Sequence, residues 1–173
     1  MHLLKSFFFP SEVIIKLLKR LGIVLFTLFL TRVIFYIANS DGFSAVTIFD
    51  FIAGSWFDAI TIAIFFMPYY ALYLIPIPLD YRNSTVYKVV FRVFFHLLNA
   101  IMMLFNLIDV EYFKFTSKRS TADLFTLVGT GDDMSQLIGV FIKDFWFLIV
   151  LFILFIFLVD YLYRKTDKKE IHL

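Results

Sequence analysis

The residues best suited to chemistry form a polar stripe inside a long apolar stretch. Arg92, His96, Asn99, Asn106 and Asp109 follow one another at intervals of four, three, seven and three residues. Such intervals place side chains on one face of a helix. The stripe could line a path for a substrate or headgroup, or it could hold neighbouring helices together through hydrogen bonds. Because unpaired polar groups are costly within a bilayer, we expect this face to contact protein.

A second set of candidates follows the stripe directly. Lys118 and Arg119 are two adjacent cations that could hold the phosphate of a lipid headgroup, with Glu111 and Tyr112 one to two helical turns before them. They could equally be ordinary anchors at the membrane surface. The sequence therefore predicts a lipid-headgroup region here and leaves its specificity open.

Metal and nucleophile chemistry is not expected in this chain. It has no cysteine, which excludes thiolate nucleophiles, disulfides and cysteine-based metal sites. His96 is far in sequence from the other two histidines, His2 and His172. A proton relay or a metal ligand is conceivable for His96, but a hydrogen bond within the helix bundle is the expected role. We find no Ser/His/Asp set and no glycine-rich nucleotide loop, so no catalytic residue is assigned.

The composition places the chain in a membrane. Of the 173 residues, 61% are apolar and 21% aromatic, and the mean hydropathy is +0.87. Soluble globular domains do not reach these values. A membrane span needs about 20 residues, so the chain has room for four or five spans and no soluble catalytic domain. The formal net charge of +2 is too small to indicate nucleic-acid binding.

The elements that must position these residues are helices. We predict an all-α, polytopic single membrane domain over residues 1–173, with four transmembrane helices and short interfacial helices. The spans are expected at residues 21–38, 56–76, 87–108 and 145–163. We expect an interfacial helix at 45–53 that ends at Gly54, a kink at Pro68, and an extracytoplasmic segment at 109–144 with two short helices.

The basic residues predict the orientation. Eleven Lys and Arg residues lie in the three segments assigned to the cytoplasm, four lie in the outer segments and one, Arg32, lies within a span. This bias predicts that both termini are cytoplasmic. It also brings Arg32, Asp58, Asn106 and Asp109 to a similar depth near the outer surface. We therefore expect Arg32 to pair with Asp58 or with Asp109.

Two segments resemble a known family. Gly54-Ser-Trp-Phe57-Asp58 opens a span that ends in Leu74-Ile-Pro76, and Asn106-x-x-Asp109-x-x-Tyr112 is followed by Arg119-x-Thr121. Together they resemble the N-terminal membrane region of lipoteichoic acid synthase-like proteins, the phosphoglycerol transferases and sulfatase-like hydrolases of the alkaline phosphatase superfamily. The resemblance covers roughly residues 10 to 165.

The resemblance implies a bacterial cytoplasmic (inner) membrane protein with about five spans before a large extracytoplasmic catalytic domain. That domain would carry manganese or zinc and a threonine or similar nucleophile. Because residues 1–173 depart from this pattern after a fourth span, we expect them to lack the catalytic domain and to hold no cofactor and no catalytic residue.

Three functions follow as expectations. The first is a membrane anchor that presents phospholipid headgroups to the enzyme domain and is not catalytic by itself. The second is a small non-enzymatic subunit that packs against a larger membrane complex or forms a homo-oligomer. The third is a small transporter or channel, which the polar stripe favours and the lack of an inverted repeat disfavours. Membrane phospholipids are the expected partners in the first case.

Overall fold

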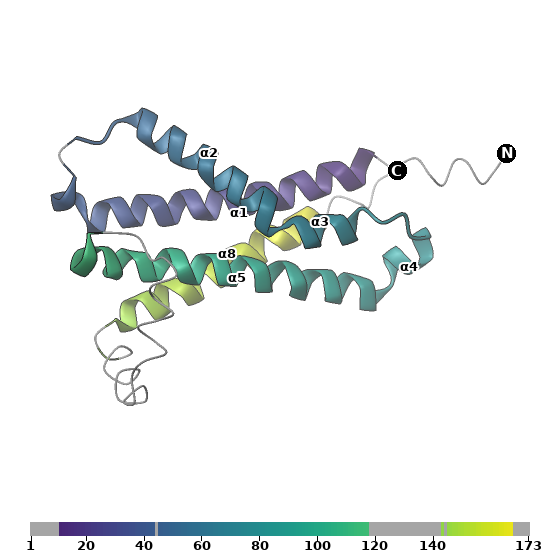
Figure 1. Ribbon diagram of the computed structural model, residues 1–173. Coiled ribbons are helices and arrows are strands. Elements are labelled where there is room, and N and C mark those ends of the chain that lie inside the picture. Colours follow the sequence, from purple (N-terminus) through teal and green to yellow (C-terminus); the bar gives the residue numbers. More distant parts are fainter. Residues whose placement is uncertain (1–10, 44, 118–142, 144, 168–173) are drawn as a thin grey trace, which may run out of the picture.

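The computed structural model describes residues 11–43, 45–117, 143 and 145–167, and the described residues form helices without any strand. Four of these helices are long and apolar enough to cross a membrane (Figure 1). This confirms the all-α, four-span expectation for the described residues. The two short helices expected within the 109–144 segment lie outside them.

The four long helices are joined by short elements. They are α1 (Ser11–Ala38), α2 (Ile48–Phe65), α5 (Thr85–Thr116) and α8 (Trp146–Asp167). The short elements are the 3₁₀ turn η1 (Ser40–Gly42), α3 (Met67–Tyr73) and α4 (Leu79–Asn83).

Two predicted helix ends fall well inside the observed helices. α1 begins at Ser11 and not near residue 21, and α5 continues to Thr116 and not to 108. The apolar stretch marks only the part of a helix that suits lipid, whereas the backbone hydrogen bonds continue into polar flanks. As a result, Asp109 and Glu111 lie on the last turns of α5 and not in a loop.

The predicted interfacial helix at 45–53 is wrong as a separate element. α2 begins at Ile48 and continues through Gly54 without a break. Its start is fixed by Asp50, whose Oδ2 accepts hydrogen bonds from the backbone N–H of Thr47 (2.7 Å) and from its hydroxyl (2.8 Å). A glycine weakens a helix by only about 1 kcal/mol, which packing against α1 can offset.

The break expected at Pro68 is present two residues earlier. The helix is interrupted at Phe66, and Pro68 occupies the first turn of α3. Proline has no N–H and therefore cannot continue the hydrogen bonding of α2. Phe66 is fully buried at this point, so the interruption lies inside the bundle.

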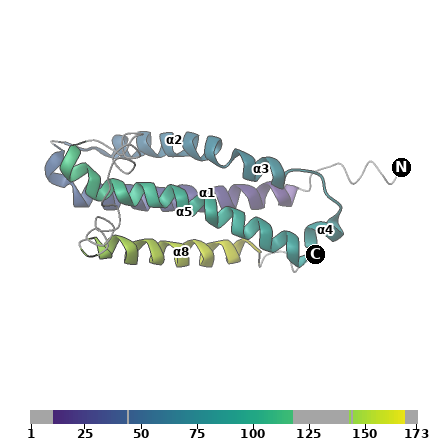
Figure 2. The ribbon, with the colours of Figure 1, turned by 60° about the horizontal axis from the view of Figure 1, so that its bottom comes forward.

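The helix α1 is the centre of the arrangement, since α2, α5 and α8 all pack against it (Figures 1 and 2). The start of α1 and the end of α8 lie side by side, as contacts of Lys16 and Arg20 with Asp167 show. We call this the terminal end of the bundle and the other the distal end. The side of the membrane on which this end lies is a prediction.

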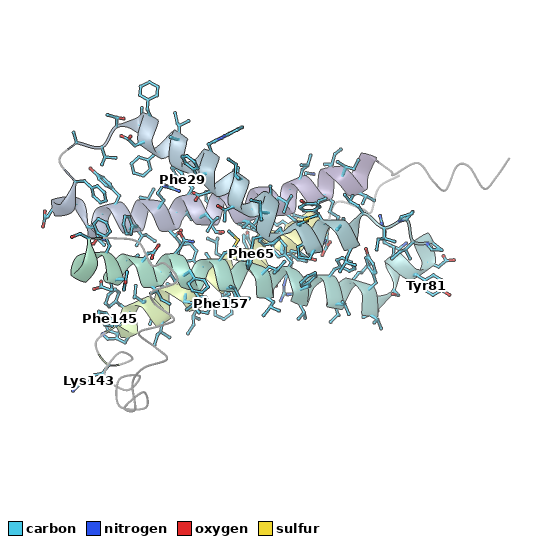
Figure 3. The ribbon with its side chains drawn as sticks, in the orientation of Figure 1. Phe29, Phe65, Tyr81, Lys143, Phe145 and Phe157 are labelled. Carbon is cyan, nitrogen blue, oxygen red and sulfur yellow. The ribbon has the colours of Figure 1, made fainter. Side chains whose placement is uncertain are left out.

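Aromatic side chains fill the middle of the bundle (Figure 3). Phe66 and Phe95 meet edge to face with ring centroids 5.7 Å apart, and Phe95 lies 5.0 Å from Tyr163. All three rings are almost wholly buried. These rings form a packed aromatic layer in the middle of the bundle, beside His96.

Candidate lipid-headgroup groove

An ion pair joins α1 to α2 towards the distal end. Arg32 Nη2 donates to Asp58 Oδ1 at 2.7 Å, and its Nε donates to Oδ2 at 3.2 Å. The same Nη2 donates to the carbonyl oxygen of Gly54 at 2.9 Å. The predicted pairing of Arg32 with Asp58 is therefore confirmed, with both carboxylate oxygens engaged.

Gly54 is needed for this contact for a steric reason. A Cβ at this position would lie 2.2 Å from Nη1 of Arg32, closer than any real contact. Gly54 and Asp58 are one helical turn apart, so they lie on the same face of α2 and hold the guanidinium together. Two residues of the Gly54-Ser-Trp-Phe57-Asp58 segment thus have one shared physical role.

A groove of about 330 Å³ lies next to this ion pair, between the distal end of α1 and the start of α2. α2 diverges from α1 towards Ile48, which leaves this space open (Figure 1). Arg32 and Asp50 contribute the charged groups of its lining. The ring of Tyr36 packs edge to face on Phe51, with centroids 5.6 Å apart, and forms part of the aromatic wall.

The groove offers a donor and an acceptor of opposite charge. Nε and Nη2 of Arg32 are occupied by Asp58 and Gly54, whereas Nη1 has no acceptor among the described residues. The Asp50 carboxylate is exposed and binds Thr47 through one oxygen. Because a guanidinium N–H suits a phosphate oxygen and a carboxylate suits an ammonium, this lining fits a headgroup that carries both charges.

The polar stripe of α5 faces the protein, as predicted. Asn99 is fully buried and Asp109 is 7% exposed. Several of its groups bond to their own helix: Asn106 Nδ2 donates to the carbonyl of Met102 at 2.9 Å, and His96 Nδ1 lies 2.8 Å from the carbonyl of Arg92. The Oδ1 atom of Asn99 is buried and has no hydrogen-bond partner in the described part of the chain.

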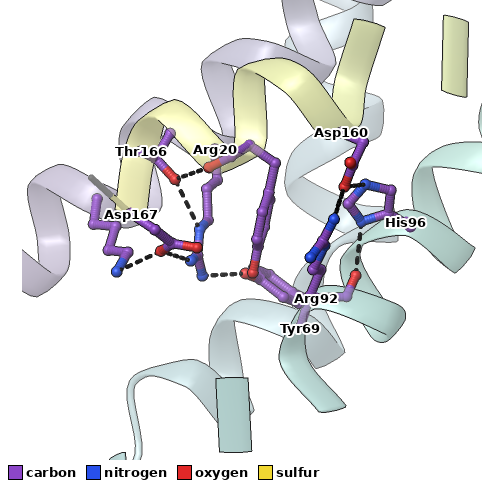
Figure 4. Close-up of polar contacts among 9 residues, drawn as sticks. Arg20, Tyr69, Arg92, His96, Asp160, Thr166 and Asp167 are labelled. Atoms are coloured by element: carbon purple, nitrogen blue, oxygen red, sulfur yellow. Dashed lines mark hydrogen bonds and ion pairs between the residues drawn. The ribbon is translucent and has the colours of Figure 1, made fainter. Parts of the chain in front are cut away.

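One partner of this stripe was not anticipated from the sequence. Asp160 of α8 accepts a hydrogen bond from Nε of Arg92 at 3.0 Å and contacts its Nη2 (Figure 4). Asp160 also accepts a hydrogen bond from Nε of Arg164 at 2.8 Å. Nε2 of His96 lies 3.3 Å from the same carboxylate, outside hydrogen-bonding geometry. The available signal was a lone acid in an almost wholly apolar helix, four residues before an arginine.

A second unanticipated cluster surrounds Arg20 at the terminal end. This residue was assigned to the cytoplasmic flank, yet it is only 4% exposed. Its Nη1 donates to the hydroxyl of Tyr69 and its Nη2 to Asp167, both at 2.9 Å (Figure 4). The guanidinium also lies 4.2 Å from the ring centroid of Tyr163 and 5.2 Å from that of Tyr73. The folded ends of three helices thus converge on one cation.

The expected headgroup residues after the stripe are placed only in part. Glu111 is buried and binds Lys114 Nζ at 2.6 Å, and Tyr112 is half-buried. Lys118 and Arg119 lie outside the described residues. Nothing therefore tests the phosphate contact predicted for these two cations, and the Arg32 groove is the better-defined candidate.

Neither metal chemistry nor homology narrows the function further. Within the described residues, no group of three His, Cys, Asp or Glu side chains could hold a metal ion. Comparisons with known proteins found no matching family model, no matching curated protein and no matching solved structure.

Proposed function

We propose that the chain is a membrane anchor domain that presents a phospholipid headgroup to a phosphoglycerol transferase or sulfatase-like catalytic domain and performs no chemistry itself. The observation that carries this proposal is the groove beside Arg32, which combines a guanidinium whose Nη1 has no acceptor among the described residues, a carboxylate and aromatic walls. Lipid headgroups present the complementary phosphate. A groove open towards lipid at one end of a spanning bundle is the place from which a headgroup is handed to a neighbouring domain.

The family part of the proposal rests on the segment that resembles lipoteichoic acid synthase-like proteins. Two of its residues, Gly54 and Asp58, hold Arg32 at the edge of the groove. The segment that contains Gly54 and Asp58 therefore fixes the position of the Arg32 guanidinium, and headgroup binding needs a guanidinium held in a fixed position.

The orientation is part of the proposal. The terminal end lies in the cytoplasm of a bacterium and the groove lies in the outer leaflet of its inner membrane. The excess of Lys and Arg in residues 1–20, 80–92 and 164–169, eleven in all, supports this. An extracytoplasmic catalytic domain would then meet the groove on the same side of the membrane.

Transport is disfavoured by the interior of the bundle. Phe66 and Phe95 close its middle, and Thr27 and Thr31 of α1 bond to carbonyls of their own helix, Val24 (2.9 Å) and Leu28 (2.8 Å). A polar path needs groups that face each other across water, and a packed aromatic layer provides none.

Photo-crosslinking in nanodiscs tests the headgroup groove. A photoreactive amino acid replaces Val46 in the groove wall or Ile153, which is exposed on α8, with equal amounts of phosphatidylethanolamine and phosphatidylglycerol present. We expect Val46 to label phosphatidylethanolamine preferentially, because its ammonium suits Asp50, and Ile153 to label both lipids equally. Since a phosphoglycerol headgroup has no ammonium, this result would favour the sulfatase-like enzyme over the phosphoglycerol transferase. Asp50→Asn should abolish the preference, whereas Thr47→Val, which keeps the carboxylate, should retain it. The same lipid ratio at both positions would contradict headgroup binding in this groove.

The intact mass of the native protein tests the anchor. The proposal expects this membrane domain to be purified joined to, or in stoichiometric complex with, a hydrolase or transferase domain. A native product fused to a domain of another class would contradict the family assignment. Headgroup binding in the groove would then be tested by the crosslinking experiment alone.

One observation favours the alternative of a subunit in a larger complex. The face of α2 turned away from α1 exposes large apolar side chains, and this helix packs mainly on one neighbour. Trp56 is 69% exposed and Phe57 67% exposed. A partner helix on this face would be detected as a stoichiometric protein in the same intact-mass experiment.

A further inference from the structure

A second groove lies at the terminal end, on the side of the bundle where α1 and α8 meet. Its volume is about 440 Å³. It is lined from α1 by Lys19, Gly22, Ile23 and Phe26, and from α8 by Leu162, Lys165 and Thr166. It is distinct from the groove beside Arg32, because the two contain different residues at opposite ends of α1.

The charge of this groove is one-sided. Lys19 and Lys165 line it from neighbouring helices, and none of the described residues that line it carries a carboxylate. Asp167, the acid closest in sequence to Lys165 among the described residues, is held by Lys16 at 2.7 Å and by Arg20 at 2.9 Å. The ammonium of Lys165 lies 4.3 Å from the ring centroid of Tyr161. This cation–π contact leaves the positive charge of Lys165 in place.

Most of the other residues that line the groove are apolar, and the space beside Gly22 is unoccupied. Gly22, Ile23 and Phe26 follow Lys19 at three, four and seven residues, so they continue along the same face of α1. A Cβ added at Gly22 would meet nothing within 4 Å. Ordinary membrane-surface lysines need only lipid around their stems, whereas here two lysines from neighbouring helices line one groove together with apolar side chains.

We propose that this groove binds one anionic phospholipid. Its phosphate lies between the ammoniums of Lys19 and Lys165, and an acyl chain lies over Gly22 against Ile23 and Phe26. Charge complementarity selects an anionic headgroup, since a lysine near an anionic lipid surface favours binding by about fivefold. The apolar part of the groove selects a lipid over a free phosphate ion. The site is independent of the proposed function, because it uses neither Arg32 nor Asp50.

Native mass spectrometry of the full chain in equimolar phosphatidylglycerol and phosphatidylcholine tests the proposal. We expect wild type to retain phosphatidylglycerol preferentially, and the exposed double variant Lys19→Gln/Lys165→Gln to reduce the ratio of the two lipids by at least about fivefold. Lys88→Gln removes an exposed lysine from the terminal end outside this groove and is the matched control. It should leave the ratio unchanged.

The variant Gly22→Leu distinguishes lipid binding in the groove from lipid binding by surface charge alone. It keeps both lysines and fills the space over which the chain would lie, so bound phosphatidylglycerol should fall as in the double variant. If Gly22→Leu folds and retains the lipid, or if Lys88→Gln lowers the ratio as much as the double variant, the selectivity comes from general surface charge and the proposal is wrong. If Gly22→Leu does not fold, the comparison of the exposed lysine variants decides the matter.

Discussion

Replacing Gly54 by alanine tests the proposed role of the ion pair between α1 and α2. In an ordinary helix interior this change stabilises by about 1 kcal/mol, because glycine is a poor helix former. Here the new Cβ would lie 2.2 Å from Nη1 and 2.4 Å from Cζ of Arg32, so the guanidinium must move. The side chain is flexible, and the cost therefore lies in the hydrogen bonds that it gives up and not in the contact itself.

The size of the effect follows from those bonds. Moving the guanidinium removes the bond to the Gly54 carbonyl (2.9 Å) and weakens at least one of the two to Asp58. Bonds to charged groups contribute about 1.5–3 kcal/mol each. The Arg32 and Asp58 side chains are 21% and 15% exposed, which reduces the cost. After the gain in helix propensity, we expect Gly54→Ala to lower the free energy of unfolding by about 1–3 kcal/mol.

Unfolding by SDS in mixed micelles, followed by circular dichroism, measures this change. The matched control is Gly22→Ala, a second helical glycine whose added Cβ meets nothing within 4 Å; it should be neutral or stabilising. In a background where Arg32→Met and Asp58→Leu replace the ion pair by apolar groups, Gly54→Ala should behave like Gly22→Ala. If Gly54→Ala destabilises equally in both backgrounds, Arg32 is not the reason for the glycine.

Three further changes test two buried polar residues and one helix cap by the same unfolding assay. Arg20→Lys keeps the charge but loses the planar contact between Tyr73 and Tyr163 and at least one hydrogen bond, so we expect a loss of about 1–3 kcal/mol; a loss below about 0.5 kcal/mol would contradict this. Asn99→Leu removes the buried oxygen that has no partner in the described part of the chain and should be neutral or stabilising by up to about 1 kcal/mol; a loss above about 2 kcal/mol would show that this oxygen is bound. Ser84→Ala removes the hydroxyl that accepts from the Tyr87 N–H at 3.3 Å at the start of α5 and should cost about 0.5–2 kcal/mol, with Thr85→Ala as the neighbouring control.

The sequence was sufficient for those features that depend on hydrophobicity alone. The existence and number of the spans follow from apolar length, and the break near Pro68 follows from a missing N–H. The pairing of Arg32 with a carboxylate also followed, because an isolated charge in an apolar helix needs an opposite charge at the same depth, whereas the choice of Asp58 over Asp109 did not. These predictions use properties of one or two residues.

Features that depend on how helices rotate against one another could not be predicted. Arg20 lies in a basic flank, and nothing in that pattern indicates that α3 and α8 turn Tyr69, Tyr73 and Tyr163 towards it. The role of Gly54 was misassigned for the same reason. From the sequence alone, a glycine in an apolar segment indicates a helix break. In the structure, Gly54 instead allows the Arg32 side chain of α1 to approach α2 closely.

The positions of the two grooves along α1 link the fold to its proposed roles. Lys19 and Arg32 are thirteen residues apart on one continuous helix, which corresponds to about 20 Å. The hydrocarbon layer is about 30 Å thick, and the long side chain of Lys19 can reach outwards over part of the remaining difference. One rigid helix can therefore hold one cation near each leaflet surface, with the aromatic layer of Phe66 and Phe95 between them. The two grooves share no lining residue, so the two sites should bind independently, each with the headgroup that its own charges select.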